Sequence, residues 1–166
     1  MLIQTTRDDH RIAWLTALAI TIHIAESALP TPLPGVKPGL ANVITIAVLM
    51  RFGWQMATWV TLLRVVAGSL LIGTFLSPTF VLSLSGALAS TVILGLVSLL
   101  PGQGCGPLGY SVAAALTHTM AQIWVAYGLF IQHDGLFHLL PLLMTAALGF
   151  GIISGIIVRA MLEKLN

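Results

Sequence analysis

The sequence predicts an all-α membrane protein, because it is strongly apolar, nearly free of charge and divided by helix-breaking residues into long apolar segments. Hydrophobic residues make up 57% of the 166 residues and charged residues only 7%, and the mean hydropathy is +1.00. Soluble domains carry about 25% charged residues, so this chain has too few charges to cover a surface that faces water. The composition therefore indicates one polytopic membrane domain over residues 1–166.

Six apolar segments are candidates for membrane-spanning helices. A helix needs about 20 apolar residues to cross a hydrocarbon core of ~30 Å, and the second candidate, which follows Pro38 and Gly39, is the shortest. Turn signals separate the later segments at Ser77-Pro78, at the glycine- and proline-rich run 101–107 and at 132–135. The predicted spans are 12–29, 40–52, 54–74, 79–100, 108–131 and 136–161.

The distribution of lysine and arginine predicts the orientation. With six spans, the two termini, the turn after the second span and the loop after the fourth lie on one side of the membrane. That side holds Arg7, Arg11, Arg51, Arg159 and Lys164, whereas the other side holds Lys37 alone. By the positive-inside rule, both termini lie in the cytoplasm and the protein lies in the cytoplasmic (inner) membrane. A cleaved signal peptide ending near Ala25-Glu26-Ser27 is the alternative, which the length of the first apolar segment disfavours.

A proline- and glycine-rich loop joins the first two spans. The run 32–42 contains three prolines and two glycines, so it cannot continue a helix. It carries Lys37 and Asn42, and the predicted orientation places it at the outer face. The loop therefore offers one cation and one amide to a site or a surface outside the membrane.

Arg64 is predicted inside the third span and Glu26 near the outer end of the first. Charged groups in a bilayer face a cavity or a partner, because exposing them to lipid is costly. One interpretation is a structural salt bridge between Glu26 and Arg64, with Lys37 as the competing partner of Glu26. The other makes Arg64 and Lys37 anion-binding groups at the floor and the roof of one cavity.

The fifth span carries His118 and Gln122 on one face, because residues four apart are neighbours on a helix. A backbone carbonyl could satisfy this histidine without any ligand. Polar side chains nevertheless concentrate in the middle and outer half of the spans, which favours an outward-opening pocket for a small molecule. The predicted substrate-binding residues are Lys37, Asn42, Arg64, His118, Gln122 and Glu26.

Small residues recur every four positions in two spans. Ala147, Gly151 and Gly155 do so in the sixth, and Ala13 and Ala17 in the first. Such stripes let helix backbones approach closely. We expect them to pack helices within the chain, and a stripe on an outer surface could instead dock a second protein.

Several chemistries are disfavoured by the residues present. One cysteine, and five histidines that do not pair at ligand spacing within a span, give no metal or haem site, so we expect no cofactor; His133 and His138 flank one loop and could bind a surface metal weakly. A net charge of +2 is too small and too scattered for a nucleic-acid partner.

Prenyl diphosphate synthases bind magnesium through clustered aspartates. This chain contains Asp8, Asp9 and Asp134, with the third predicted on the other side of the membrane. We therefore expect that the chain is not itself an enzyme.

Several motifs resemble those of the Gx transporter family, also labelled heptaprenyl diphosphate synthase component I. The resemblance covers most of the chain, from Ala13 to about Gly155, and two residues depart from the family pattern, Pro38 and Thr119. The motifs that carry it are Glu26 through Asn42, Leu62-Leu63-Arg64, Gly68 through Pro78, Ser83-Leu84-Ser85-Gly86 and His118-Thr119-Met120-Ala121-Gln122.

The resemblance implies a six-helix bundle similar to the substrate-binding S-components of energy-coupling-factor importers. The ligand would then be captured near the outer face by the residues predicted above. Ala13 and Ala17 would dock a membrane coupling subunit that works with cytoplasmic ATPases. A flavin, a quinone or an isoprenoid precursor is the class of ligand that the family suggests.

Three functions remain open at this point. The first is a membrane component that captures or transports a small anionic or amphipathic molecule. The second is a non-catalytic accessory subunit of polyprenyl diphosphate or quinone biosynthesis. The third is a structural subunit of a membrane redox assembly. The chain has no ATP-binding motif, so active transport would need energy from another subunit.

Overall fold

The described part of the protein is entirely helical. The structure is a computed structural model that describes residues 6–28, 40–99 and 106–165. Within these residues the chain forms helices α1 (Arg7–Ala28), α2 (Leu40–Phe52), α3 (Trp54–Ile72), α4 (Pro78–Ser98), α5 (Pro107–Leu129), α6 (Gly135–His138) and α7 (Leu140–Leu165). The prediction of an all-α fold is confirmed.

Three of the described helices, α3, α4 and α7, are long and apolar enough to cross a membrane. Helix α2 is apolar but has 13 residues, which at ~1.5 Å per residue is too short for a hydrocarbon core of ~30 Å. Helices α1 and α5 are long but more polar, because α1 begins with charged residues and α5 carries polar side chains along one face. These helices support a multi-pass membrane protein, whereas the count of six spans is not confirmed.

Local sequence signals explain most helix ends. Thr6 and Asp9 form a capping box at the start of α1, in which the Thr6 backbone N–H donates to Asp9 Oδ2 at 2.7 Å and lowers the pKa of that carboxyl. Gly53 joins α2 to α3 with φ = 90°, a conformation that glycine adopts without strain. At the start of α4, the Ser77 hydroxyl accepts from the Phe80 backbone N–H at 3.3 Å, and Pro78 follows in the first turn.

Most of the predicted span 136–161 lies in α7, which is long and apolar enough to cross a membrane, but its first residues form the separate short helix α6. Pro141 has no N–H to donate to the carbonyl four residues earlier, that of Phe137. The Leu139 N–H instead donates to the Leu136 carbonyl at 3.1 Å, which tightens the last turn of α6. The chain therefore changes direction between α6 and α7.

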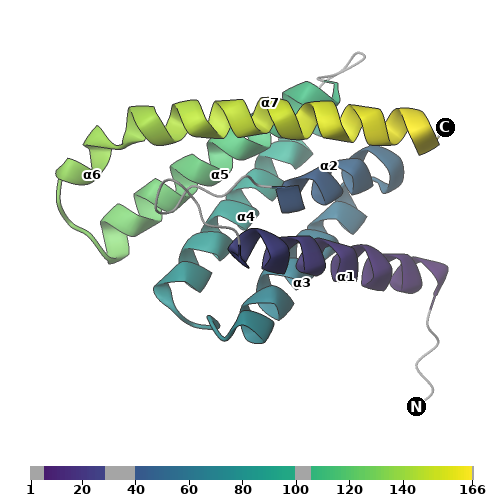
Figure 1. The fold of residues 1–166 in the computed structure, drawn as a ribbon, viewed down its shortest axis with the longest axis horizontal. Coiled ribbons are helices and arrows are strands. Elements are labelled where there is room, and N and C mark those ends of the chain that lie inside the picture. The colour runs from purple at the N-terminus through teal and green to yellow at the C-terminus, as the bar shows by residue number, and fades with distance from the viewer. Residues whose placement is uncertain (1–5, 29–39, 100–105, 166) are drawn as a thin grey trace.

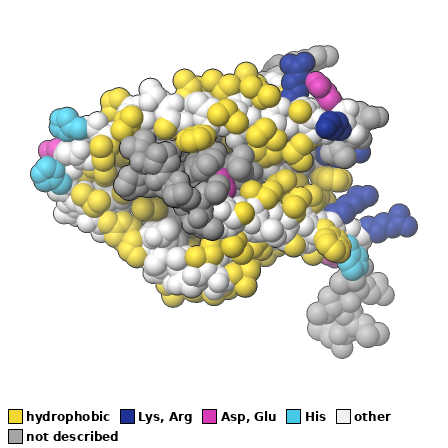
Figure 2. Space-filling view, in the orientation of Figure 1, with side chains coloured by type: hydrophobic (Ala, Val, Ile, Leu, Met, Phe, Trp, Pro, Cys, Tyr) yellow, Lys and Arg dark blue, Asp and Glu magenta, His cyan; other side chains and the backbone are white. Residues whose placement is uncertain are grey.

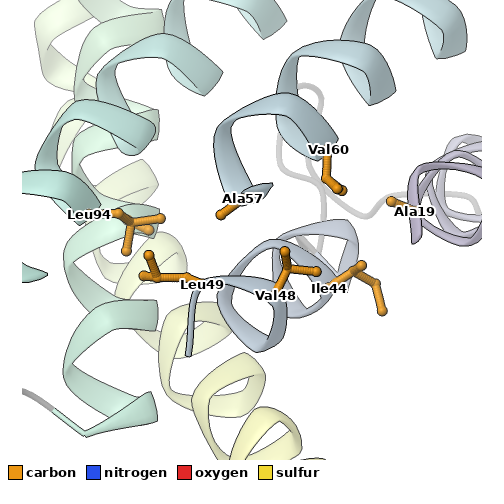
Figure 3. Packing of buried hydrophobic residues seen from close by; sticks show 8 residues of the cluster. Ala19, Ile44, Val48, Leu49, Ala57, Val60 and Leu94 are labelled. Atoms are coloured by element: carbon orange, nitrogen blue, oxygen red, sulfur yellow. The ribbon is translucent and has the colours of Figure 1, made fainter. Parts of the chain in front are cut away.

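Helix α2 lies at the centre of the bundle, in contact with α1, α3, α5 and α7 (Figure 1). Figure 3 shows its side chains Ile44 and Val48 toward Ala19 of α1 and Val60 of α3, and its Leu49 beside Leu94 of α4. Val43 and Ile46 on another face of α2 pack against Val158 of α7 in a second cluster. A helix that is apolar all round is stable when it is buried all round, which explains the position of α2.

The small-residue stripe of α7 packs against α5, as predicted. Ala147, Gly151 and Gly155 are all buried. A Cβ at Gly155 would lie 2.7 Å from the Leu108 Cα, and a Cβ at Gly151 would lie 3.1 Å from the Val112 Cα. The glycines therefore let the two backbones approach more closely than any larger residue would allow.

Positive charge gathers at one end of the bundle. Figure 2 shows lysine and arginine side chains at the right-hand end, where α1 begins and α7 ends in Figure 1. These are the exposed residues Arg7, Arg11, Arg51, Arg159 and Lys164. The loop residues His133 and Asp134, before α6, lie at the other end. Among the described residues, the exposed lysines and arginines thus lie at one end of the bundle, whereas Lys37, predicted on the other side, lies outside the described residues.

Candidate functional site

A cavity of about 430 Å³ lies in the half of the bundle away from the cationic end. All seven described helices contribute to its wall. Its polar lining residues are His23, Glu26, Asn42, Arg64, Thr79, Ser83, Ser111, His118, Thr119, Gln122 and Ser154. Cavities of 300–1,000 Å³ are the usual size for small-molecule sites.

Arg64 of α3 is the buried cation of this wall, with 5% of its surface exposed. Its Nη2 donates to Asn42 Oδ1 of α2 at 3.3 Å, and it interacts electrostatically with Glu26 of α1, which is also buried. Its Nε is buried and has no hydrogen-bond partner among the described residues. Residues of α1 and α2 thus hold the guanidinium of α3 in place, while its buried Nε–H has no partner among the described residues.

His118 of α5 lies directly against Gly86 of α4. A Cβ at residue 86 would meet the ring atoms Cε1 and Nε2 at 2.7 Å, so the absence of a side chain there makes room for the imidazole. The other ring nitrogen, Nδ1, is buried without a hydrogen-bond partner in the described part of the chain. On the α1 side of the cavity, a Cβ at Gly68 of α3 would lie 3.3 Å from the His23 Cδ2.

The structure brings together five of the six predicted substrate-binding residues. Asn42, Arg64, His118, Gln122 and Glu26 all line the cavity, although they come from four different helices. Lys37 lies outside the described residues. Whether these residues bind a substrate stays a prediction, but their convergence on one cavity is a property of the fold.

The predicted docking residues Ala13 and Ala17 do not line the cavity. Both are exposed on α1 beside Trp14, which is 78% exposed, and Leu18. The described neighbours of α1 leave this face uncovered. A docking role for the stripe stays a prediction.

Several polar lining residues were not predicted as site residues, notably Ser111, Thr119 and Ser154. The signal for Ser111 was present, because it lies seven residues before His118 and therefore on the same face of α5. Ser154 lies within a strongly apolar helix, where an isolated serine gives no indication of which face it occupies.

The wall of the cavity is chemically divided. Helices α1, α2, α3 and α5 supply its ionisable and amide groups, whereas the segment from α6 into α7 supplies Leu136, Leu139, Leu143 and Phe150. Such a division suits an amphipathic molecule, with its polar group toward Arg64 and its apolar part toward α7.

The described residues contain no group of three or more histidine, cysteine, aspartate or glutamate side chains placed to hold a metal ion. His133, one of the two histidines considered for a weak surface metal, accepts a hydrogen bond at Nδ1 from the Gly135 backbone N–H at 2.9 Å. This hydrogen bond holds the imidazole ring at the start of α6.

Replacing Gly86 by alanine is expected to displace the His118 ring with little change in stability. The new methyl group would overlap the far edge of the imidazole, which can rotate away, and alanine favours the helix by up to about 1 kcal/mol. The side-chain NMR signals of His118 should therefore shift in Gly86→Ala. They should stay in place in Gly128→Ala, where nothing lies within 4 Å of the new Cβ. Unchanged signals in the first variant would contradict the close contact.

Comparison with protein families shows which family this chain belongs to. The family described as heptaprenyl diphosphate synthase component I matches residues 15–161. The chain belongs to this family. No curated protein sequence and no solved structure matches it, so the likeness to S-components stays a prediction. The description of this heptaprenyl diphosphate synthase component I family names one component of a synthase. Among the described residues that line the cavity, Glu26 is the acidic one.

Proposed function

We propose that this protein is a membrane component that captures a small amphipathic or anionic molecule in the cavity between α1, α3, α5 and α7, in the manner of an S-component. The observation that carries the proposal is the convergence of buried polar groups in one cavity inside an apolar bundle. Arg64 and Glu26 are both at least nine-tenths buried there, and buried charged groups in a membrane usually serve a substrate or ion pathway.

The position of the cavity suggests the direction from which the ligand enters. Glu26 lies near the end of α1 and Asn42 near the start of α2, away from the exposed arginines and lysine. If the cationic end faces the cytoplasm, both termini are cytoplasmic, the protein lies in the inner membrane and the cavity opens toward the outside. A coupling subunit, powered by ATPases, would then contact the exposed face of α1 at Ala13 and Ala17.

A second candidate function rests on the family description, which names a synthase component and so suggests a partner. In that case the protein would be an accessory membrane subunit of polyprenyl diphosphate or quinone biosynthesis. It would co-purify with a soluble synthase rich in aspartates, and Ala13→Leu would disrupt that association if α1 provides the contact.

Native mass spectrometry of the gently extracted protein tests the first proposal. We expect a retained small molecule in the wild type and a loss of most of this signal in Gln122→Leu, because Gln122 is a polar group of the wall with no described structural partner. The matched control is Gln132→Leu, an exposed position after α5, which should retain the molecule at the wild-type level. A wild-type spectrum that shows only protein, lipid and detergent would contradict the proposal.

A further inference from the structure

Helices α5 and α7 lie side by side (Figure 1), and a second hollow, of about 360 Å³, lies on their joint surface. On each helix, the change from cavity to second hollow takes place between neighbouring residues. Thr119 and Leu143 line the cavity, whereas Met120 and Met144 line the second hollow. The two hollows therefore lie on opposite sides of the contact between α5 and α7. We call the second one the groove; its described lining residues are Leu116, Thr117, Met120, Ala121 and Trp124 of α5 and Met144 of α7.

The backbones of α5 and α7 approach closely toward the cationic end. A Cβ at Gly151 or at Gly155 of α7 would lie 3.1 Å or 2.7 Å from a backbone atom of α5. Nearer the start of α7, the cavity and the groove border the contact from both sides, and the half-buried Met120 and Met144 belong to it. A methionine side chain is unbranched and turns about three bonds. This part of the contact can therefore open by rotation of side chains, without separation of the two backbones.

The groove faces the hydrocarbon of the membrane. Helix α7 is long and apolar enough to cross a bilayer, and no lysine, arginine, aspartate or glutamate occurs in 107–129 or in 140–158. Among the described lining residues of the groove, Thr117 supplies a hydroxyl and Trp124 an indole N–H, and the others are apolar. A hydrocarbon chain is the occupant that such an uncharged surface inside a bilayer favours.

The end of the groove nearest to α6 carries aromatic side chains. Trp124 is 58% exposed, and its ring lies 5.7 Å from that of Phe137 in α6, which also lies 4.8 Å from the ring of Tyr127. Tryptophan and tyrosine are enriched at the boundary between the hydrocarbon core and the head groups. The groove thus extends from this boundary into the core, as the chain of an amphiphile in one leaflet does.

We propose, resting on the capture function above, that the ligand is an amphiphile dissolved in the bilayer and that it enters the cavity from the side, between Met120 and Met144. Its hydrocarbon chain occupies the groove before entry. Transfer of such a chain through water is unfavourable, and entry from the groove avoids it. Behind the two methionines, Leu143 and Phe150 belong to the apolar wall of the cavity that the chain then meets.

Alkylation of a cysteine in the cavity tests this route. Ala115→Cys places a thiol in the cavity wall, and Cys105→Ser removes the one native cysteine. This parent variant in lipid nanodiscs is treated with N-dodecylmaleimide, which partitions into the bilayer, or with a sulfonated methanethiosulfonate, which is anionic and stays in water. Intact-protein mass spectrometry measures the rate of each reaction. We expect N-dodecylmaleimide to modify the cavity cysteine, and Gln122→Cys is a second reporter position in the same wall.

Changes at Met144 should alter the rate with N-dodecylmaleimide in opposite directions. Met144→Ala removes bulk from the route and should raise this rate about fivefold, whereas Met144→Phe should lower it about fivefold. The water-soluble reagent should keep its rate in both variants. Met50→Ala and Met50→Phe are the matched controls, because Met50 is an exposed methionine of α2 and is not among the described residues of either hollow. Melting temperatures report whether each variant folds, and the same changes at Met120 replace any that does not.

The possible outcomes separate the side entrance from the capture function. Equal rates with N-dodecylmaleimide in the parent, Met144→Ala and Met144→Phe overturn the side entrance, and so does a cavity cysteine that N-dodecylmaleimide does not modify. Parallel changes in the rates of both reagents also overturn it, because the substitutions would then have altered the cavity and not the route. Capture is judged by the retained molecule in native mass spectrometry, so either proposal can fall while the other stands.

Discussion

Replacing Gly155 by valine should destabilise the protein by about 3 kcal/mol or prevent its folding. A Cβ at this position would lie 2.7 Å from the Leu108 Cα and 3.3 Å from the Leu108 N, which are backbone atoms of α5. A backbone cannot rotate away as a side chain can, so α7 would have to move off α5. Thermal unfolding of the purified protein in nanodiscs measures the effect.

Gly149→Val is the matched control, because it makes the same chemical change in the same helix. Nothing lies within 4 Å of a Cβ at Gly149, so its unfolding free energy should change by less than about 0.5 kcal/mol. Equal melting temperatures for the two variants would show that α7 does not pack against α5 as closely as described. Since Gly151 and Ser154 line the cavity from α7, Gly155→Val should also disturb the site.

The helices could be located from the sequence because their ends carry strong local signals. Ser77 and Pro78 begin α4 with a side-chain cap and a first-turn proline, and Gly53 permits the positive φ between α2 and α3. The break before α7 was missed for a physical reason. A proline such as Pro141 is tolerated in the first turn of a helix and disrupts an interior, and hydropathy alone does not distinguish the two cases.

The site was predictable to the extent that polar residues are conspicuous in apolar segments. Arg64, Glu26 and His118 stood out for this reason, and the fold places all three in one cavity. The contact between His118 and Gly86 was not predictable, because it depends on how α4 and α5 cross. Local spacing fixes which residues share a helix face, whereas the meeting of two faces is decided by the packing of the whole bundle.

We expect the effects of Glu26 and Arg64 on the free energy of unfolding to be coupled, so that replacing both costs less than the sum of the two single replacements. Ligand retention should not recover in the double variant in the same way. Both residues are buried, and removing one member of a buried charged pair costs about 3–5 kcal/mol, because the other charge loses its compensation. Arg64→Gln and Glu26→Gln should each destabilise the protein by an amount in this range. The double variant should be less destabilised than the sum of the two, because neither charge then remains.

Ligand retention separates the structural and functional interpretations of this pair. If Arg64 contacts the ligand, the folded double variant should still lose the retained molecule in native mass spectrometry, although its stability has partly returned. Arg159→Gln, which removes an exposed arginine paired with Glu163 at 2.9 Å, should change neither stability nor retention appreciably. A double variant that retains the molecule at the wild-type level would make the pair a packing element alone. The affinity of the cavity would then have to come from the other residues predicted to bind, namely Lys37, Asn42, His118 and Gln122, of which the last three line the cavity.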